Sequence, residues 1–487
     1  MASWLNVLRR LAVDTSSPRS EEDYELLPSS NGSPAGAGAR KWHQRRSARG
    51  LLYACLHLFT VRRLLILLVS VPLLLVLGVL WSGVPPSYAD IRAFERNLPQ
   101  HNVSLAVVAA RTGHEPKYLR FPGHLWGHGL NNILQEILLM SQLAYLSNRS
   151  YVFEDYVWSK LPFPYTVYDF ALRPTRMPIN AFISGPSAGG PMPGGAQAVS
   201  AEFWESVCPK ERRHVLSTEG APSAELGAEG SALMEWWVER LKGVDESCVE
   251  IEQDSLKDPI FHRILFGTPQ VLSLWPSLSA SPVLTDFMWS PLVQSAILRN
   301  FPLLQPASAK ALYSPGTLPG LVAVHLRRGD FKRHCARLSG WGSAYMGFNQ
   351  FPALPDKFDP VPHNTSAPAL LQYYLEHCLP EIPQIVERLH AVRAERPDLN
   401  RVYLLTNGWG WWLNRLKDAL RKDGWADATS SLDIQLDAAQ SYVGMAVDMA
   451  IAEKAEVFVG NGFSSLSSNI VMLRMAKGLE PSLNRFL

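Results

Sequence analysis

The sequence predicts an α/β protein with two parallel sheets, and two observations lead to this prediction. Short apolar runs with strand character alternate with helical patterns, both before and after the middle of the 487-residue chain. The runs are apolar along their length, which is typical of parallel strands covered on both faces. We therefore expect two Rossmann-like lobes, with a ligand bound between them outside the carboxyl ends of the strands.

The first lobe is expected to open with a strand, a helix and a second strand. A short strand at 118–121 leads into a glycine-rich turn, which is followed by a helix at 130–146 and a strand at 151–153. A run rich in Gly and Pro at 184–195 predicts a mobile loop.

The second lobe shows the more regular alternation of strands and helices. Its expected elements, in chain order, are a strand at 321–326, one long helix at 370–394, a strand at 401–405, a helix after Trp409, a helix at 438–455, a strand at 457–459 and a last helix at 466–477.

An uncharged apolar run at 64–81 predicts one transmembrane helix, because at about 1.5 Å per helical residue it is just long enough to cross a bilayer. A signal peptide is the alternative, but 63 residues precede the run and it exceeds the usual hydrophobic region of such peptides. The stretch before the run, from Arg40 to Arg63, is basic and carries no acidic residue, which leaves the N-terminus cytosolic.

This orientation makes the chain a single-pass type II membrane protein whose bulk faces the lumen of the secretory pathway, in the Golgi or the endoplasmic reticulum. We divide it into a disordered basic cytosolic tail (1–63), a transmembrane anchor (64–82), a stem (83–115), an N-terminal lobe (116–319) and a C-terminal lobe (320–487).

The luminal cysteines and sequons agree with an oxidising compartment. An even number of luminal cysteines is compatible with two disulfides, for which three pairings are open, and Cys55 is cytosolic. The formal net charge of +2 gives no reason to expect a nucleic-acid partner. The luminal residues are Cys208, Cys248, Cys335 and Cys378, with sequons at Asn102, Asn148 and Asn364.

Arg327 stands at the end of the strand at 321–326, where open α/β sheets bind ligands. A guanidinium can make bidentate, charge-assisted hydrogen bonds to a diphosphate and can stabilise the charge that grows on a leaving group. A surface strand end closed by salt bridges is the alternative interpretation.

Two further motifs suit an anion. The strand at 457–459 runs into Gly460-Asn461-Gly462, and the serines that follow can begin a helix whose amides attract phosphate. An ordinary N-capped helix would explain the serines equally well, but the paired glycines less well. The second motif, 127–132 at the first strand-to-helix turn, is a weak glycine pattern by itself.

Together these motifs resemble the protein O-fucosyltransferases, a superfamily that uses GDP-fucose. The resemblance spans about 118–478 and is faint between about 155 and 320. It rests on Gly129-Leu130-Asn131, on His325-Leu326-Arg327 followed by Asp330, and on Asp448 followed by Phe458-Val459-Gly460-Asn461 and Ser464-Ser465.

The resemblance implies a GT-B fold of two Rossmann-like lobes, GDP-fucose as donor, inversion at the anomeric carbon and no metal or other cofactor. The absence of a D-x-D triplet from the sequence is consistent with the last point. By the same resemblance, Arg327 binds the β-phosphate, His325 either supports Arg327 or contacts the nucleotide, and Asp448 contacts guanine. The remaining substrate-binding residues would be Gly129, Asn131, Asp330, Asn461, Ser464, Ser465 and Leu466.

The position of the catalytic base departs from the family. Some members carry Glu just before the Gly-x-Asn motif, and this chain has His128 there. An imidazole can accept a proton near neutral pH, so His128 is a candidate base, and a structural or donor-contacting histidine is the alternative.

The function expected from these features is fucosyl transfer from GDP-fucose to a hydroxyl of a protein or a glycan. Two alternatives stay open, which are the same fold with another nucleotide sugar and an inactive membrane protein that binds a GDP-sugar.

Overall fold

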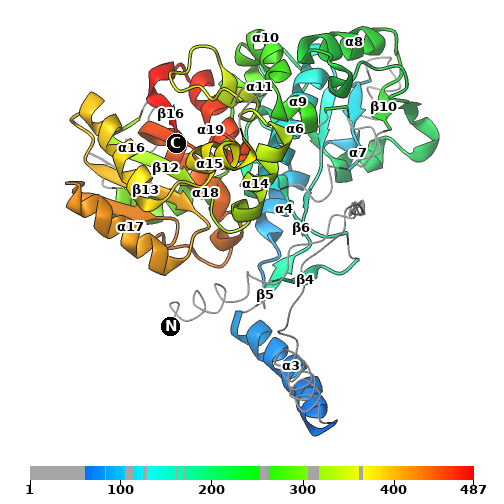
Figure 1. The fold of residues 1–487 in the computed structure, drawn as a ribbon. Helices are drawn as coiled ribbons and strands as arrows, with labels where there is room; N and C mark the ends of the chain where they lie inside the picture. Colours follow the sequence, from blue (N-terminus) through cyan, green and yellow to red (C-terminus); the bar gives the residue numbers. More distant parts are fainter. Residues whose placement is uncertain are drawn as a thin grey trace, which may run out of the picture. The chain divides into compact units, whose positions relative to one another are not determined.

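The computed structural model describes most of the chain outside its N-terminus, and Figure 1 shows how its elements follow one another. The described residues are 61–82, 84–104, 115–123, 129–160, 162–168, 171–252, 260–261, 263–304, 317–360 and 366–487. The chain divides into two compact units, one of 1–85 with 165–173 and one of 86–164 with 174–487.

The smaller unit contains the helix α3 (Val61–Ser82), which covers the predicted anchor and has Pro72 inside it. The strands β4 (Tyr165–Tyr168) and β5 (Ala171–Pro174) pair with each other. Within the part of the chain that is described, no helix is both long enough and apolar enough to cross a membrane. The predicted cytosolic tail lies almost wholly outside the described residues.

The larger unit contains two five-stranded sheets, and every strand pair in them is parallel. The first sheet has the order β8-β2-β1-β10-β9, so β1 lies beside the distant β10. Its strands are β1 (Tyr118–Arg120), β2 (Ser150–Phe153), β8 (Val199–Ser200), β9 (His214–Leu216) and β10 (Cys248–Ile251), and its main helices are α6 (Leu130–Leu146), α7 (Ala201–Val207) and α8 (Gly230–Lys242).

The second sheet has the order β14-β13-β12-β15-β16, so its first strand in sequence is its central strand in space. The strands are β12 (Leu318–Leu326), β13 (Arg401–Thr406), β14 (Asp427–Ser430), β15 (Ala455–Gly460) and β16 (Asn484–Phe486). The helices are α14 (Phe331–Trp341), α15 (Ala367–Cys378), α16 (Ile382–Glu395), α17 (Gly410–Lys422), α18 (Gly444–Lys454) and α19 (Ser465–Ala476).

The alternating side chains of β12 explain why this sheet is covered on both faces. Val322, Val324 and Leu326 pack with the apolar faces of α16 and α17 in one cluster. Leu321 and Ala323 point to the other face and join a larger cluster with α18 and α19. That larger cluster also contains α6 and β1, so the two sheets share one hydrophobic core.

Shorter elements complete the described structure. They are α4 (Ala89–Arg96), β3 (Tyr156–Val157), β6 (Arg176–Met177), η1 (Ile179–Ala181), β7 (Ile183–Ser184), η2 (Pro186–Ala188), η3 (Lys210–Arg212), η4 (Ala224–Leu226), α9 (Arg263–Gly267), η5 (Pro269–Leu274), α10 (Trp275–Ser279), α11 (Pro282–Thr285), β11 (Met288–Trp289), α12 (Pro291–Arg299), α13 (Phe301–Leu304), η7 (Gly347–Gln350), η8 (Gln440–Tyr442) and η9 (Pro481–Leu483).

The prediction of one long helix at 370–394 is wrong, because α15 ends at Cys378 and α16 begins at Ile382. Pro380 has no backbone N–H and therefore cannot continue the helix. The backbone N–H of Glu381 donates to Gln384 Oε1 over 2.8 Å, which starts α16 afresh. The break leaves a connecting segment, 378–381, whose carbonyls are available to other partners.

The glycine-rich run at 184–195 is packed, although the sequence predicts a mobile loop. A Cβ atom on Gly195 would lie 2.6 Å from the ring of Tyr145, and one on Gly190 would lie 2.8 Å from the backbone of Gly185. These glycines therefore permit close approach of neighbouring groups.

The predicted stem also differs from the structure, since 86–104 belongs to the larger unit. Tyr88 and Leu98 are buried in the main core. Arg92 of α4 forms a bidentate pair with Asp155, with N–O distances of 2.9 and 3.2 Å. Burial of Tyr88 and Leu98, which lie on either side of α4, together with the Arg92–Asp155 pair explains this docking.

The structure selects one of the three possible disulfide pairings. Cys208 bonds to Cys248 beside the first sheet, and Cys335 bonds to Cys378 beside the second. Cys55 and the sequon residue Asn364 lie outside the described residues.

Candidate functional site

The carboxyl edge of the second sheet is the place where a ligand is expected. β12 and β15 are neighbours in the sheet, although β13 and β14 come between them in the sequence. The chain leaves the sheet in opposite directions on the two sides of this point, and such a crossover opens a crevice at the carboxyl ends of the strands. Arg327 directly follows β12, and Asn461 directly follows β15.

Arg327 is held at this edge by Asp330. Its Nε and Nη2 atoms donate to the two carboxylate oxygens over 3.0 and 2.8 Å, and its side chain keeps 34% of its exposure. The guanidinium also lies 5.2 Å from the ring of Phe331. The fork is thus oriented by one carboxylate while remaining accessible to an anion from solvent.

Asn407, which follows β13, ties the same loop together. Its Nδ2 donates to Asp330 Oδ1 over 3.0 Å, and its Oδ1 accepts the backbone N–H of Arg328 over 2.8 Å. Burial alone would raise the pKa of Asp330, but hydrogen bonds from Arg327 and Asn407 and the charge of Arg327 hold that pKa below its usual value. Asp330 is therefore ionised when it orients Arg327.

Arg328, although adjacent, points into the protein. Its side chain is buried, its Nη1 donates to the carbonyl of Pro380 over 2.7 Å, and its guanidinium stacks 4.3 Å from the ring of Trp412. The two consecutive arginines thus face different environments, and only Arg327 faces solvent to an extent that suits ligand binding.

His325 is buried behind Arg327. Its Nδ1 lies 2.8 Å from Ser467 Oγ. Burial, reinforced by the positive charge of Arg327, lowers the pKa of His325 to about 3. The imidazole is therefore neutral at physiological pH and adds no charge that would compete with Arg327 for an anion.

Ser467 joins the two loops at this edge. Its Oγ accepts the backbone N–H of Asn461 over 3.0 Å while it contacts His325. A hydroxyl can accept one hydrogen bond and donate another at the same time. The end of β12 and the loop after β15 are thereby coupled through one buried serine.

The loop after β15 is shaped by Asn461 and Gly462. Asn461 Oδ1 accepts the N–H of Phe463 over 3.1 Å, and its Nδ2 donates to the carbonyl of Cys378 over 2.7 Å. A Cβ atom at Gly462 would lie 2.3 Å from the ring of Tyr345, so only glycine fits there.

The loop delivers the chain into α19, whose N-cap is Ser464. The Ser464 side chain makes no capping hydrogen bond to the first turn. Ser464 and Leu466 are buried, and Ser465 is partly exposed. An anion at this helix start would meet backbone N–H groups and the positive end of the helix dipole.

Asn131 links the first lobe to the site. The backbone carbonyl of Asn131 accepts from Asn469 Nδ2 over 2.8 Å, and its own Nδ2 lies 3.2 Å from the sulfur of Met445. One turn further along α6, Gln135 Nε2 donates to Ser468 Oγ over 3.2 Å. The start of α6 therefore packs on α19, where Gly129 is the exposed N-cap. His128 lies outside the described residues.

Asp448 lies on α18 and faces β13. Its carboxylate accepts from the hydroxyls of Tyr403 and Ser431, over 2.5 and 2.8 Å. Burial raises the pKa of Asp448 to about 6, although the two hydroxyls counteract that rise. The residue is a hydrogen-bond acceptor beside the carboxyl ends of β13 and β14, which suits a base edge with N–H donors.

Sequence reasoning did not single out Asn407, Ser467, Gln135 or Asn469, each of which organises the site. Ser464, Ser467 and Ser468 have the helical spacing of one face, and that spacing was a usable signal for Ser467. Asn407 and Gln135 carry no comparable local signal, because their partners are distant in sequence.

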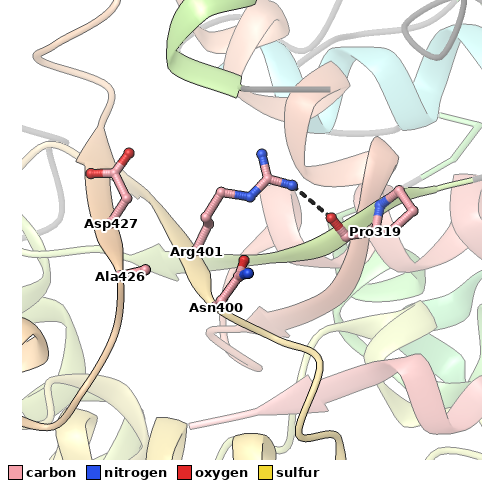
Figure 2. Close-up of a pocket in the computed structure, with 5 residues that line it drawn as sticks. All are labelled: Pro319, Asn400, Arg401, Ala426 and Asp427. Atoms are coloured by element: carbon pink, nitrogen blue, oxygen red, sulfur yellow. Dashed lines mark hydrogen bonds between the residues drawn. The ribbon is translucent and has the colours of Figure 1, made fainter. Parts of the chain in front are cut away.

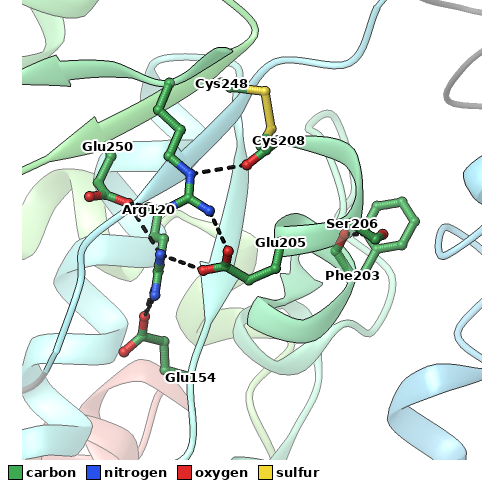
Figure 3. A network of polar contacts seen from close by, with 9 residues as sticks. Arg120, Glu154, Phe203, Glu205, Ser206, Cys208, Cys248 and Glu250 are labelled. Atoms are coloured by element: carbon green, nitrogen blue, oxygen red, sulfur yellow. Dashed lines mark hydrogen bonds and ion pairs between the residues drawn. A yellow bond between two sulfur atoms is a disulfide. The ribbon is translucent and has the colours of Figure 1, made fainter. Parts of the chain in front are cut away.

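The carboxyl edge of the first sheet carries a different arrangement, which we call the first-sheet network (Figure 3). Arg120 at the end of β1 pairs with Glu154, Glu205 and Glu250 at N–O distances of 3.0, 2.9 and 3.2 Å. Arg213 also pairs with Glu205 and Glu250. The indole of Trp204 lies 4.7 and 4.1 Å from the two guanidinium carbons.

An open cleft of about 590 Å³ lies elsewhere on the second sheet (Figure 2). It is lined by Pro319, Asn400, Arg401, Ala426 and Asp427. These residues stand at the amino ends of β12, β13 and β14, on the edge opposite Arg327. Ligands of open parallel sheets bind at the carboxyl ends, so this cleft is not the expected donor site.

The residues that the structure describes contain no group of three or more His, Cys, Asp and Glu side chains arranged to hold a metal ion. Arg327 and the start of α19 supply positive charge at the carboxyl edge of β12.

Comparison with known proteins identifies the part of the chain that carries this edge. Residues 308–477 match the family model described as GDP-fucose protein O-fucosyltransferase. The match includes β12, β15 and the start of α19, and therefore Arg327, Asn461 and Ser464. No curated protein matches the chain.

Several solved structures are similar at low identity. The crystal structure of POFUT1 in complex with GDP-fucose is 14% identical, with a TM-score of 0.43 and coverage of 76% of this chain and 97% of that one. NodZ α-1,6-fucosyltransferase soaked with GDP-fucose is 10% identical, with a TM-score of 0.36 and coverage of 74% and 93%. An Arabidopsis thaliana FUT1 mutant in complex with GDP is 10% identical, with a TM-score of 0.36 and coverage of 82% and 79%.

The family match, rather than these distant likenesses, carries the assignment. It confirms the resemblance inferred from His325, Arg327 and the loop at Asn461. Residues 308–477 therefore match the GDP-fucose protein O-fucosyltransferase family, which is a family of glycosyltransferases.

Proposed function

We propose that this protein transfers fucose from GDP-fucose to a hydroxyl of a protein or glycan, with inversion at the anomeric carbon and without a metal ion. The proposal is carried by the position of two groups at the crossover between the neighbouring strands β12 and β15. The accessible Arg327 follows β12, and the loop and helix start at 461–466 follow β15. This pairing falls inside the region that matches the O-fucosyltransferase family model.

In this proposal the donor binds in a GT-B arrangement, with its diphosphate at the second sheet. The guanidinium of Arg327 binds the β-phosphate, and the first turn of α19 with Ser464, Ser465 and Leu466 contacts the phosphate and base. Asp448 accepts hydrogen bonds from guanine, for which its ionised form is required. Gly129 and Asn131 approach the sugar from the first lobe.

The transfer step forms one bond and breaks one. The acceptor oxygen attacks the anomeric carbon from the face opposite the diphosphate, and the bond from that carbon to the β-phosphate oxygen breaks. GDP departs with the bonding electrons, and Arg327 stabilises the resulting charge. A base takes the acceptor proton, and we propose His128 for this role because an imidazole titrates near neutral pH.

Residues of the chain can supply the charge stabilisation that a metal supplies elsewhere. Arg327 is a fixed cation, and neutral His325 neither repels the diphosphate nor binds it as a second cation. The start of α19 adds a partial positive charge. These groups support a metal-independent mechanism.

We also propose a type II membrane protein whose catalytic part lies in the lumen of the Golgi or the endoplasmic reticulum. The uncharged run at 64–81 and the basic residues before it support this proposal. Two disulfides beside the two sheets suit an oxidising compartment. Alkaline carbonate extraction of cell membranes tests the anchor, because a merely associated protein would be released into the supernatant.

The decisive experiment incubates the purified full-length chain, in detergent, with GDP-fucose and a glycoprotein mixture, and measures GDP release and radioactive fucose incorporation. Other GDP-sugars serve as parallel donors in the same assay, and UDP-sugars are assayed by the release of UDP. Release from GDP-fucose above the rate from every other donor is the expected result. Faster release from another sugar nucleotide would identify that alternative donor, and GDP binding without release from any donor would identify an inactive binding protein.

A further inference from the structure

We propose that the Cys335–Cys378 disulfide and the connecting segment 378–381 position the two donor-binding loops, so that they set the affinity for the GDP portion of the donor. This inference rests on the proposed function. It concerns residues that do not themselves reach the ligand but hold those that do.

The first loop is held through Arg328. Arg328 Nη1 donates to the carbonyl of Pro380 over 2.7 Å, and Arg328 Nη2 lies 3.6 Å from the carboxylate of Glu381. Because Arg328 is the residue after Arg327, these contacts with the connecting segment determine where the backbone of the first loop lies at the end of β12. The guanidinium of Arg328 is also buried against the ring of Trp412, which restricts the side chain to this conformation.

The second loop is held through Asn461. Its Nδ2 donates to the carbonyl of Cys378 over 2.7 Å, and both groups are buried. Asn461 also organises the turn that leads to α19, since its Oδ1 accepts the N–H of Phe463. The connecting segment therefore contacts both loops, one on each side of the crossover.

The helix break explains why these carbonyls are available. The last carbonyls of a helix have no partner within the helix. α15 ends at Cys378, and Pro380 prevents the following residues from continuing it. The carbonyls of Cys378 and Pro380 accept from the loops instead.

The disulfide adds a covalent link between the connecting segment and α14. It joins Cys378 to Cys335 on α14, the helix that starts one residue after Asp330. Both cysteines are fully buried. The two loops are thus linked through α14, the disulfide and the connecting segment. Without the disulfide, the connecting segment can shift relative to both loops.

The test compares two double variants by isothermal titration calorimetry with GDP on the full-length protein. Cys335→Ser with Cys378→Ser is expected to weaken GDP binding by about tenfold, since displacement of binding groups by about 1 Å is costly. Cys208→Ser with Cys248→Ser is the matched control, because that disulfide lies beside the first sheet and closes a similar loop, 40 residues against 43. Circular dichroism at the titration temperature must show that both variants are folded.

A second pair of variants decides the matter if a cysteine variant does not fold. Arg328→Met keeps an apolar contact with Trp412 but cannot donate to Pro380, and it is expected to weaken GDP binding by about fivefold to tenfold. Arg328→Lys can still donate one hydrogen bond and should restore part of the affinity.

The outcomes separate this inference from the proposed function. Wild-type affinity for GDP in folded Cys335/Cys378 and Arg328→Met variants overturns the inference alone. Equal losses in the two double-cysteine variants also overturn it, because the effect would then be general destabilisation. A wild-type protein that does not bind GDP overturns the proposed function together with the inference.

Discussion

The carboxyl edges of the two sheets share one plan and differ in charge balance. In each sheet an arginine stands at the end of the strand beside the crossover, Arg120 at β1 and Arg327 after β12. Each sheet also has a buried disulfide beside it, but Cys248 begins β10 at the amino end of that strand, whereas the carbonyl of Cys378 accepts from Asn461 at the carboxyl edge. Arg120 meets three glutamates and keeps 17% of its side-chain exposure, whereas Arg327 meets one aspartate and keeps 34%.

A crossover makes a binding edge possible, but the neighbouring charges decide whether an anion can bind there. The first-sheet network places three carboxylates around two arginines, so a diphosphate would meet excess negative charge there. At the second edge Arg327 has a single carboxylate partner and lies across the crossover from the start of α19. The same backbone plan therefore gives one edge that is neutralised internally and one that is prepared for a ligand.

The largest effect is expected on catalysis, from substitutions of Arg327 at the second edge. Arg327→Ala should lower kcat by about 10²–10³-fold, or roughly 3–4 kcal/mol, because the leaving group loses a charged donor. Arg327→Lys should also lose at least about tenfold, since an ammonium cannot reproduce the bidentate fork. Initial rates of GDP release measure both. Arg421→Ala, on the exposed surface of α17, is the control, and normal turnover in both Arg327 variants would refute the role of this residue.

A smaller effect, on stability instead of catalysis, is expected at the first edge. Arg120→Met removes a partner of two partly buried carboxylates, Glu154 and Glu250, and of the exposed Glu205, and should lower the free energy of unfolding by roughly 2 kcal/mol. Its affinity for GDP should not change. Chemical denaturation and calorimetry measure the two quantities. As a control, Arg96→Met breaks an exposed pair with Glu202 and should lower the free energy of unfolding by no more than about 0.5 kcal/mol. An equal loss of stability in both variants would show that the first-sheet network stabilises the fold no more than an exposed ion pair does.

A pH-dependent effect on stability is expected at His325. Folding lowers the pKa of His325 to about 3 from its usual 6.5, so the unfolded chain binds the proton more tightly than the folded protein. The stability that neutral His325 provides is complete above about pH 6.5 and is lost as the pH falls toward 3. The wild type should therefore lose about 2 kcal/mol relative to His325→Gln between pH 7.5 and pH 5.

The matching position in the first sheet sharpens this test. Tyr118 precedes Arg120 by two residues, as His325 precedes Arg327, and burial raises the pKa of Tyr118 to about 12. Tyr118→Phe should therefore shift stability by the same amount at pH 7.5 and pH 5. Denaturant unfolding at the two pH values measures the differences. A difference between the wild type and His325→Gln that does not change with pH would exclude a neutral, acid-sensitive His325.

The parts of the fold that sequence predicted best are those with strong local patterns. The helix predicted at 130–146 agrees with α6, and the apolar strand ends placed Arg327 and Asn461 at the sheet edge. Strands such as β8, with two residues, are too short to show a period and were not predicted. The helix break at Pro380 was missed because an apolar helical pattern continues on both sides of it.

A residue of the candidate site was predictable only where its position in a single strand or helix was enough to place it at the edge of the sheet. Arg327, Ser464 and Ser465 met that condition. Asn407 and Ser467 act through partners 77 and 142 residues away in sequence, Asp330 and His325, and such contacts depend on which strands become neighbours. No local sequence pattern specifies which strands become neighbours.

The adjacency of β12 and β15 has a consequence for the order of folding. β12 ends at Leu326, and β15 begins only at Ala455, after two intervening strands have been added on the opposite side. Contacts between such distant segments form slowly, because a long loop must close first. During synthesis, a chain that has emerged only as far as β14 can have its first sheet and its Cys335–Cys378 bond but no edge able to hold a sugar nucleotide. Donor binding is thus a property of the finished sheet, and GDP would stabilise only chains that have completed it.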